Sequence, residues 1–141
     1  MSEIRSVGVI GAGQMGTGIA QVFAQAGYKV LLNDIDAEKL QAGLGGIALQ
    51  LDKMVAREKL SVADHASTLG RLSATQDLSE LGAADLIVES ATEHEQVKVQ
   101  IFQSLAPHLG ADTLLTTNTS SISITRLAAG TDRPQRFMGM H

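Results

Sequence analysis

Three closely spaced glycines near the amino end restrict this chain to a small set of folds. Gly11, Gly13 and Gly16 form a G-x-G-x-x-G motif that follows an apolar run, residues 7–10, and opens a helical pattern. Gly11 allows a tight turn, Gly13 lets the main chain approach a pyrophosphate without a Cβ in the way, and Gly16 allows close helix–strand packing. The helix offers unpaired N–H groups and the positive end of its dipole to the phosphates. The motif in this context predicts a dinucleotide site that comprises Gly11, Gly13, Gln14, Met15 and Gly16.

An acidic residue ends the second apolar run of the chain. After a helix predicted over residues 14–26, residues 29–34 predict a buried strand that ends in Asp34. A carboxylate here accepts hydrogen bonds from the adenine-ribose hydroxyls and repels a 2′-phosphate, and neither Ile35 nor Asp36 supplies the cation that NADP recognition needs. We therefore expect Asp34 to bind the cofactor NAD rather than NADP. The alternative is that Asp34 merely caps the next helix, a role that Asp36 could fill instead.

Composition excludes several classes of function. The chain has 141 residues, 44% of them apolar and 18% charged, which is ordinary for a globular domain. A net charge of −4 without a Lys/Arg cluster argues against a nucleic-acid partner. Because there is no cysteine, the chain has no disulfide, thiolate metal site or cysteine nucleophile, and we expect no metal. The first residues lack a signal-peptide pattern and no segment reaches membrane-spanning length, so we expect a cytoplasmic protein that does not bind membranes.

The rest of the sequence alternates between predicted helices and strands. Apolar residues spaced by three and four predict a long helix over residues 37–59, in which Gly43, Gly45 and Gly46 favour a bend. The patterns further predict helices over residues 61–70, 95–105 and 121–129, and strands over residues 71–75, 84–89 and 113–117. No linker interrupts them, so we expect one domain over residues 1–141. This alternation predicts an α/β, Rossmann-like, doubly wound and mostly parallel sheet with helices on both faces.

Five segments together resemble one enzyme family. They are residues 9–16, residues 86–93, Val97 and Lys98 with Phe102, residues 117–121, and residues 139–141. In sequence and order they are similar to the L-3-hydroxyacyl-CoA dehydrogenases, particularly the bacterial 3-hydroxybutyryl-CoA dehydrogenases, over the whole chain. The resemblance implies an NAD-binding domain of an enzyme that oxidises the 3-hydroxyl of an acyl-CoA, or reduces the 3-keto group in the reverse direction.

The same resemblance assigns the reacting end of the site. It implies that His141 is the general base for oxidation and that Ser120 hydrogen-bonds the reacting oxygen beside it. Glu93 and Lys98 match family positions that contact the nicotinamide-ribose side of the cofactor. Asn118 follows a predicted strand at its carboxyl end, where ligands of open α/β sheets bind, and is expected to line the nicotinamide or substrate cleft.

Simpler roles exist for several of these residues. Ser120 could cap the helix predicted from residue 121, Glu93 could cap the helix predicted from residue 95, and Lys98 could be a solvated helix charge. The remaining histidines match no catalytic position and are expected at the surface; they are His65, His94 and His108.

The resemblance also places coenzyme A on the long helix after Asp34. It implies that Lys53 and Arg57 bind the coenzyme A phosphates. Two positions depart from the family pattern, since Gln50 stands where a small polar residue is usual and Glu58 where glycine is usual. The alternative is that Lys53, Arg57 and Lys59 form an ordinary charged helix face.

Relatives in this family continue past the position of His141. They add an Asn, then a carboxylate that orients the histidine, and then a helical domain that closes the acyl-CoA cleft and forms most of a homodimer contact. We therefore expect residues 1–141 to be an NAD-binding domain truncated at its carboxyl end, without the helical domain, and with little turnover alone.

Two other classes of protein share parts of this pattern. Some lens crystallins resemble the family, so a non-catalytic, NAD-binding structural protein is the main alternative. Other β-hydroxyacid dehydrogenases, which use a lysine base, share the glycine-rich start but lack the segments at residues 117–121 and 139–141.

Overall fold

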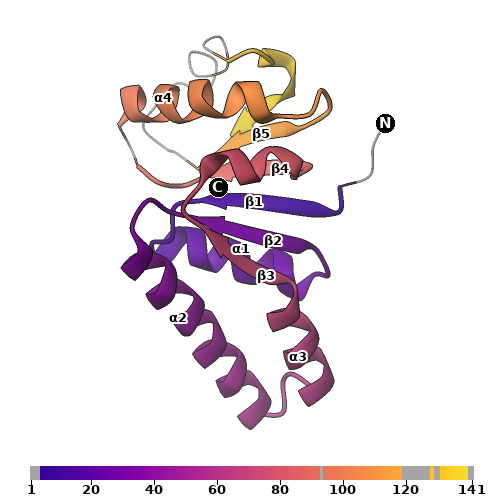
Figure 1. Ribbon diagram of the computed structural model, residues 1–141. Helices are drawn as coiled ribbons and strands as arrows, with labels where there is room; N and C mark the ends of the chain where they lie inside the picture. Colours follow the sequence, from indigo (N-terminus) through magenta and orange to yellow (C-terminus); the bar gives the residue numbers. More distant parts are fainter. Residues whose placement is uncertain (1–3, 93, 119–127, 129–130, 140–141) are drawn as a thin grey trace.

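Six parallel strands form one sheet in the order β3-β2-β1-β4-β5-β6 (Figure 1). The computed structural model describes residues 4–92, 94–118, 128 and 131–139. The strands are β1 (Ser6–Ile10), β2 (Lys29–Asn33), β3 (Leu72–Thr75), β4 (Leu86–Glu89), β5 (Leu114–Thr117) and β6 (Phe137–Gly139). Val9 of β1 is in register with Leu32 of β2 on one side and with Val88 of β4 on the other. The order of the strands reverses between β1 and β4, the point at which open sheets of this kind bind ligands.

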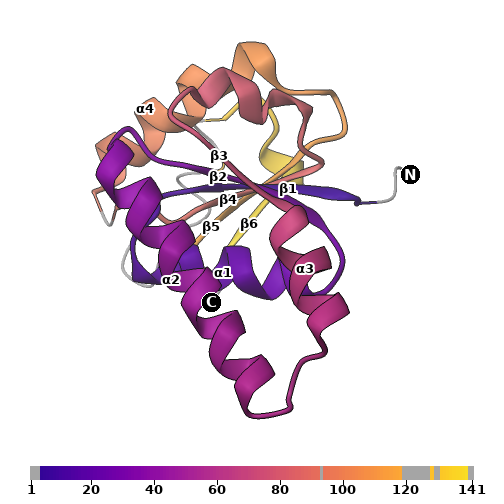
Figure 2. The same ribbon diagram turned by 60° about the horizontal axis from the view of Figure 1, so that its bottom comes forward.

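Helices cover both faces of this sheet. In the part of the chain that the structure describes, the α-helices with defined bounds are α1 (Gln14–Gln25), α2 (Ala37–Ala56), α3 (Val62–Gly70) and α4 (Glu95–Leu105). Short 3-10 segments occupy η1 (Leu78–Ala83), η2 (Ala106–His108) and η3 (Pro134–Arg136). Figure 2 shows α1, α2 and α3 on one side of the sheet and α4 on the other, with α2 and α3 projecting beyond the strands.

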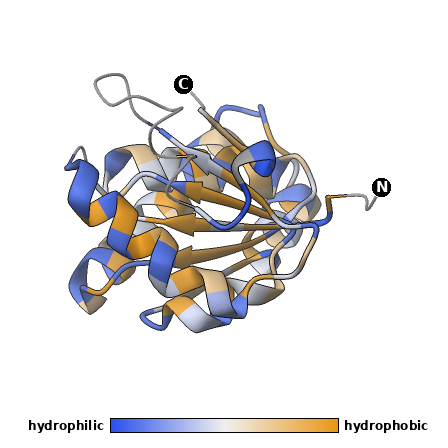
Figure 3. Cartoon of the chain, turned by 90° about the horizontal axis from the view of Figure 1, so that it is seen from above, coloured by the Kyte–Doolittle hydropathy of each residue, from blue (hydrophilic) through white to orange (hydrophobic). Residues whose placement is uncertain are grey.

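Each face of the sheet has its own hydrophobic core. Val7 and Val9 point into the core shared with α1 and α2, whereas Ile10 points into the core shared with α4. In the second core Phe102 of α4 meets Phe137 of β6 edge to face, with ring centroids 5.0 Å apart. Figure 3 shows mostly hydrophobic strands at the centre of the domain and hydrophilic residues on the outer parts of the helices.

Two helices end in the same backbone motif with different residues. The turn after α1 contains Gly27, which has a φ of 106°, and the Tyr28 N–H donates back to the Phe23 carbonyl at 3.1 Å. The rings of Phe23 and Tyr28 pack edge to face across this turn, 5.6 Å apart. Glu58 occupies the same position in the turn after α2, at a φ of 59°. This backbone conformation costs free energy for any residue with a Cβ.

The structure confirms the doubly wound α/β sheet and corrects details of it. α2 ends at Ala56 rather than residue 59, and it runs through its three glycines without interruption. β6 was not predicted, because three residues carry too little periodicity to reveal a strand. The helix expected over residues 121–129 lies outside the described residues except for Ala128.

Two expected absences concern only the described part of the chain. Within it, no helix combines the length and the apolar character that crossing a bilayer demands. The same residues include no group of three or more His, Cys, Asp or Glu side chains arranged to hold a metal ion.

Candidate functional site

The turn between β1 and α1 leaves no room for side chains at two of its glycines. Gly11 has a φ of 104°, and a Cβ there would come within 2.8 Å of the Ala91 Cα. A Cβ at Gly16 would lie 1.7 Å from the Gly11 carbonyl oxygen. These two glycines are therefore required by the packing of the turn itself, as the motif predicts.

Gly13 differs from both, because a Cβ there would meet no atom within 4 Å. It is the residue before α1, and no side chain caps this helix, whereas Asp36 caps α2 and Ser61 caps α3. Gln14 and Met15 are exposed, and the first turn of α1 contains no acidic residue. A helix start with free space and no competing acceptor fits a pyrophosphate, so the residues present suit a dinucleotide.

Asp34 braces the glycine turn. Its Oδ2 accepts the Ala12 N–H at 2.9 Å, and its Oδ1 accepts the Asp36 N–H at 3.0 Å. The carboxylate of Asp36, not that of Asp34, caps α2 by accepting the Glu38 N–H at 2.9 Å, so the capping alternative for Asp34 is wrong. Each oxygen of Asp34 keeps a second acceptor site, which leaves the side chain able to bind ribose hydroxyls.

A cavity of about 360 Å³ lies next to Asp34 at the carboxyl edge of the sheet. Ile35, Val97 and Ile101 form apolar walls, and Ile35 is 83% exposed. Lys39 and Asp36 line the polar side of the same cavity. Apolar side chains beside a carboxylate with free acceptor sites suit a heterocyclic base next to a ribose.

A buried polar network lies at the ends of β4 and β5. Glu89, Lys98 and Thr117 are each 0% exposed. Glu89 Oε1 pairs with the Lys98 ammonium and accepts the Thr117 Oγ1 hydroxyl at 2.7 Å, while Oε2 accepts the Ala91 N–H at 2.7 Å. Lys98 is therefore not a solvated helix charge, and that alternative is wrong.

Glu89 was not identified as a site residue from the sequence. Two signals could have found it, the acid at the end of an otherwise apolar strand and the lysine on the inward face of the next helix. Lys98, Phe102 and Leu105 are all buried and follow the spacing of one helix face, so a charge at the first of them needs a buried partner.

Asn118 follows β5 directly and joins this region. Its N–H donates to the Glu89 carbonyl oxygen at 2.8 Å, and it is half-buried. The structure therefore brings the glycine turn, Asp34, Lys98 and Asn118 to one edge of the sheet. Glu93, Ser120 and His141 lie outside the described residues.

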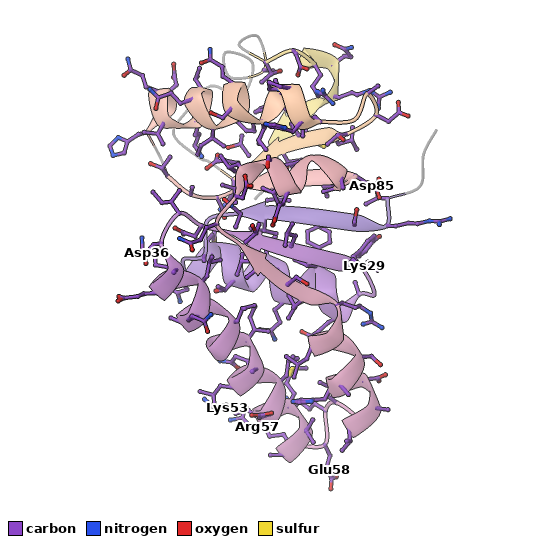
Figure 4. All side chains as sticks on the ribbon, in the orientation of Figure 1. Lys29, Asp36, Lys53, Arg57, Glu58 and Asp85 are labelled. Carbon is purple, nitrogen blue, oxygen red and sulfur yellow. The ribbon has the colours of Figure 1, made fainter. Side chains whose placement is uncertain are left out.

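The two candidate coenzyme A residues are separate from that edge. Lys53 and Arg57 are exposed near the end of α2 that lies farthest from Asp36, as Figure 4 shows. Lys53 lies 17 residues after Asp36, which corresponds to roughly 25 Å along the helix axis. Only a long ligand could contact both this end of α2 and the carboxyl edge of the sheet.

None of the other described histidines is among the residues that line the cavity beside Asp34. His94 and His108 are exposed, as expected. His65 is half-buried, and its Nε2 lies 2.7 Å from Asp52 Oδ1, so it links α3 to α2.

Comparison with known proteins decides the family. The family profile described as "3-hydroxyacyl-CoA dehydrogenase, NAD binding domain" matches residues 6–141. The chain belongs to the 3-hydroxyacyl-CoA dehydrogenase family. NAD is accordingly the cofactor that this type of domain binds, in agreement with the glycine turn and Asp34.

Individual relatives of this dehydrogenase domain agree. A 3-hydroxybutyryl-CoA dehydrogenase of Bradyrhizobium diazoefficiens is 46% identical over 138 residues, which cover 98% of this chain and 47% of the relative. A 3-hydroxyadipyl-CoA dehydrogenase of Escherichia coli is 47% identical over 141 residues, which cover 100% of this chain and 30% of the relative. The crystal structure of the (S)-3-hydroxybutyryl-CoA dehydrogenase of Ralstonia eutropha superposes with a TM-score of 0.94 at 44% identity, over 99% of this chain and 49% of that one. The chain thus spans half or less of the length of these relatives.

Proposed function

We propose that this chain is the cofactor-binding domain of an enzyme that interconverts 3-hydroxyacyl-CoA and 3-ketoacyl-CoA with NAD. The observation that carries the proposal is the combination of open space at Gly13, an uncapped α1 and the placement of Asp34 beside them. Family membership supplies the reaction, and the 3-hydroxybutyryl-CoA dehydrogenases among the relatives favour a short acyl chain.

In this proposal each described site residue has one task. The N–H groups at the start of α1 hold the pyrophosphate over Gly13, and Asp34 holds the adenine ribose and disfavours a 2′-phosphate. The adenine ring occupies the cavity that Ile35 and Val97 line. Together these contacts hold the cofactor along the edge of the sheet.

The reacting groups are proposed from the family resemblance. NAD, when bound, supplies the hydride acceptor or donor. His141 removes the hydroxyl proton in the oxidation direction, Ser120 hydrogen-bonds the reacting oxygen, and Asn118 lines the pocket beside them. Lys53 and Arg57 bind coenzyme A phosphates through their charge.

The remainder of the enzyme is also proposed. The relatives are about twice as long as this chain or longer, which supports a further substrate-binding part beyond the NAD-binding domain over residues 1–141. We propose that this part is a helical domain and that it forms a homodimer. A cytoplasmic location stays a prediction.

Two measurements test the proposal. Titration calorimetry on this chain is expected to show NAD+ binding at micromolar concentration and NADP+ binding weaker by about tenfold or more. A longer protein containing the chain is expected to oxidise NADH in the presence of acetoacetyl-CoA, and His141→Gln is expected to lower that rate by about 10²–10⁴-fold. NAD+ binding without any turnover by the longer protein would favour a non-catalytic, crystallin-like protein instead.

A further inference from the structure

The proposed contacts at the carboxyl edge of the sheet imply where the second nucleoside of the cofactor lies. If Asp34 after β2 holds the adenine ribose and the turn after β1 holds the pyrophosphate, the other nucleoside continues in the same direction along the edge. The next strands in that direction are β4 and β5. Their last residues are Glu89 and Thr117, which the buried network joins.

Stability alone gives a weak account of this network. A lysine and a glutamate that are both fully buried lose their hydration, and their attraction about offsets that cost. Apolar residues of similar volume would hold α4 against β4 and β5 equally well. No buried side-chain polar atom in the described residues lacks a hydrogen-bond partner, so the polar atoms of this network are all satisfied.

The network fixes the backbone that borders the glycine turn. Glu89 Oε2 accepts the Ala91 N–H, and Ala91 is the residue against which Gly11 packs. The Ser90 N–H donates to the Ile10 carbonyl at 2.8 Å, which locks the end of β4 to the end of β1. A carboxylate with three donors therefore determines how the turn after β4 sits beside the phosphate-binding turn.

We propose that Glu89 is a positioning residue for the second nucleoside of the dinucleotide. It acts through Lys98 and Thr117 by fixing their polar atoms under that nucleoside, and it does not contact the cofactor itself. The inference rests on the proposed NAD site and deepens it, because it assigns a role to a buried acid that neither the glycine motif nor Asp34 requires.

The test compares two ligands that differ in the second nucleoside. NAD+ and ADP share the adenosine and both phosphates, so ADP reports on the glycine turn and Asp34 while NAD+ also reports on the region over β4 and β5. Titration calorimetry of Glu89→Gln is expected to show a dissociation constant for NAD+ raised at least tenfold and a dissociation constant for ADP raised about threefold at most, since Ala91 also borders the glycine turn. A purely structural role for Glu89 would weaken both ligands equally.

Matched variants keep the test decisive if Glu89→Gln folds poorly. Thr117→Val removes one donor of the network and is expected to weaken NAD+ selectively, by about threefold to tenfold. Thr116→Val is the control, because Thr116 is buried one residue away and donates to the Ile87 carbonyl at 2.9 Å outside the network. It is expected to leave the ratio of the two dissociation constants unchanged.

A double variant separates stability from positioning. Glu89→Gln with Lys98→Met removes both buried charges and is expected to recover much of the melting temperature without recovering the preference for NAD+ over ADP. Recovery of that preference, or an unchanged preference in Glu89→Gln and Thr117→Val, would overturn the inference while leaving the NAD site in place. Failure of the unaltered chain to bind either ligand would overturn the proposed function itself.

Discussion

The Asp34 carboxylate accepts the Ala12 N–H at 2.9 Å, so the acid that we propose to bind the adenine ribose also holds the turn that we propose to bind the pyrophosphate. Gly11 adds a second tie, because its N–H donates to the Asn33 carbonyl at 2.7 Å, one residue before the acid. In the proposed site, binding of the ribose and binding of the pyrophosphate therefore depend on the same hydrogen bonds. A substitution at Asp34 is expected to affect both.

The first prediction concerns this double role. Asp34→Asn keeps an oxygen that can accept the Ala12 N–H but loses the negative charge, whereas Asp34→Arg loses both. We expect Asp34→Asn to keep the fold and to lower the ratio of the dissociation constants for NADP+ and NAD+. We expect Asp34→Arg to lower NAD+ affinity by about tenfold or more. Titration calorimetry with both cofactors measures this. Unchanged NAD+ affinity in Asp34→Arg would contradict the assigned role.

The second prediction separates two glycines of one motif. At Gly13 a Cβ meets no protein atom, so Gly13→Ala is expected to fold with a nearly unchanged melting temperature and to lose NAD+ affinity, since the methyl group occupies the phosphate position. At Gly16 a Cβ would lie 1.7 Å from the Gly11 carbonyl, so Gly16→Ala is expected to destabilise the fold by about 3 kcal/mol or more. Thermal unfolding with and without NAD+ distinguishes the two. Equal losses of stability would show that the packing of the turn requires Gly13 as much as Gly16.

Sequence patterns predicted the parts of this domain that depend on neighbours along the chain. The glycine turn, Asp34 and the start and end of α4 follow from local spacing, and the structure places them as expected. The pair of Glu89 and Lys98 depends on how α4 lies over β4, which no local pattern reveals. The buried position of Gly43 likewise depends on α1, so the sequence presented it merely as a weak point of a helix.

The third prediction tests whether Gly43 is required for packing between α1 and α2 while Gly45 and Gly46 are not. A Cβ at Gly43 would lie 2.6 Å from Thr17 Cγ2, where α1 crosses α2. A Cβ at Gly45 or Gly46 would contact no atom within 4 Å. Gly43→Ala is expected to lower the free energy of unfolding by about 1–2 kcal/mol despite its better helix propensity. Gly45→Ala and Gly46→Ala are expected to raise it by about 0.5–1 kcal/mol each. Urea unfolding measures all three, and a stabilising Gly43→Ala would show that the helices separate without cost.

The fourth prediction concerns the end of α2. Glu58, in the turn after α2, has a φ of 59°, and the Lys59 N–H donates to the Met54 carbonyl at 2.8 Å. In the equivalent turn after α1 this position is occupied by Gly27. Glu58→Gly removes the backbone strain and is expected to raise the free energy of unfolding by about 1 kcal/mol. Glu58→Gln is the control, since it removes the charge and keeps the strained backbone. Equal gains in both variants would assign the effect to charge instead of backbone conformation.

The last prediction concerns stability in acid at the opposite edge of the sheet, where Figure 4 shows Asp85 beside the start of β1. The backbone N–H groups of Arg5, at 2.8 Å, and Ser6, at 3.1 Å, donate to Asp85 Oδ2 and lower its pKa below the ordinary value of 3.8. A lowered pKa in the folded state means that the carboxylate stabilises the fold above pH 3.8 and that this contribution is lost as the pH falls through the folded-state pKa.

We therefore expect Asp85→Asn to lower the free energy of unfolding by about 1 kcal/mol at pH 7, since the side chain is partly solvated. That difference from the unaltered chain should shrink steadily below pH 4. Urea unfolding at a series of pH values measures it, with Glu58→Gln as an exposed acid for comparison. A difference that stays constant between pH 7 and pH 3 would mean that the charge of Asp85 contributes nothing, because a neutral carboxyl would then tie β1 to β4 equally well.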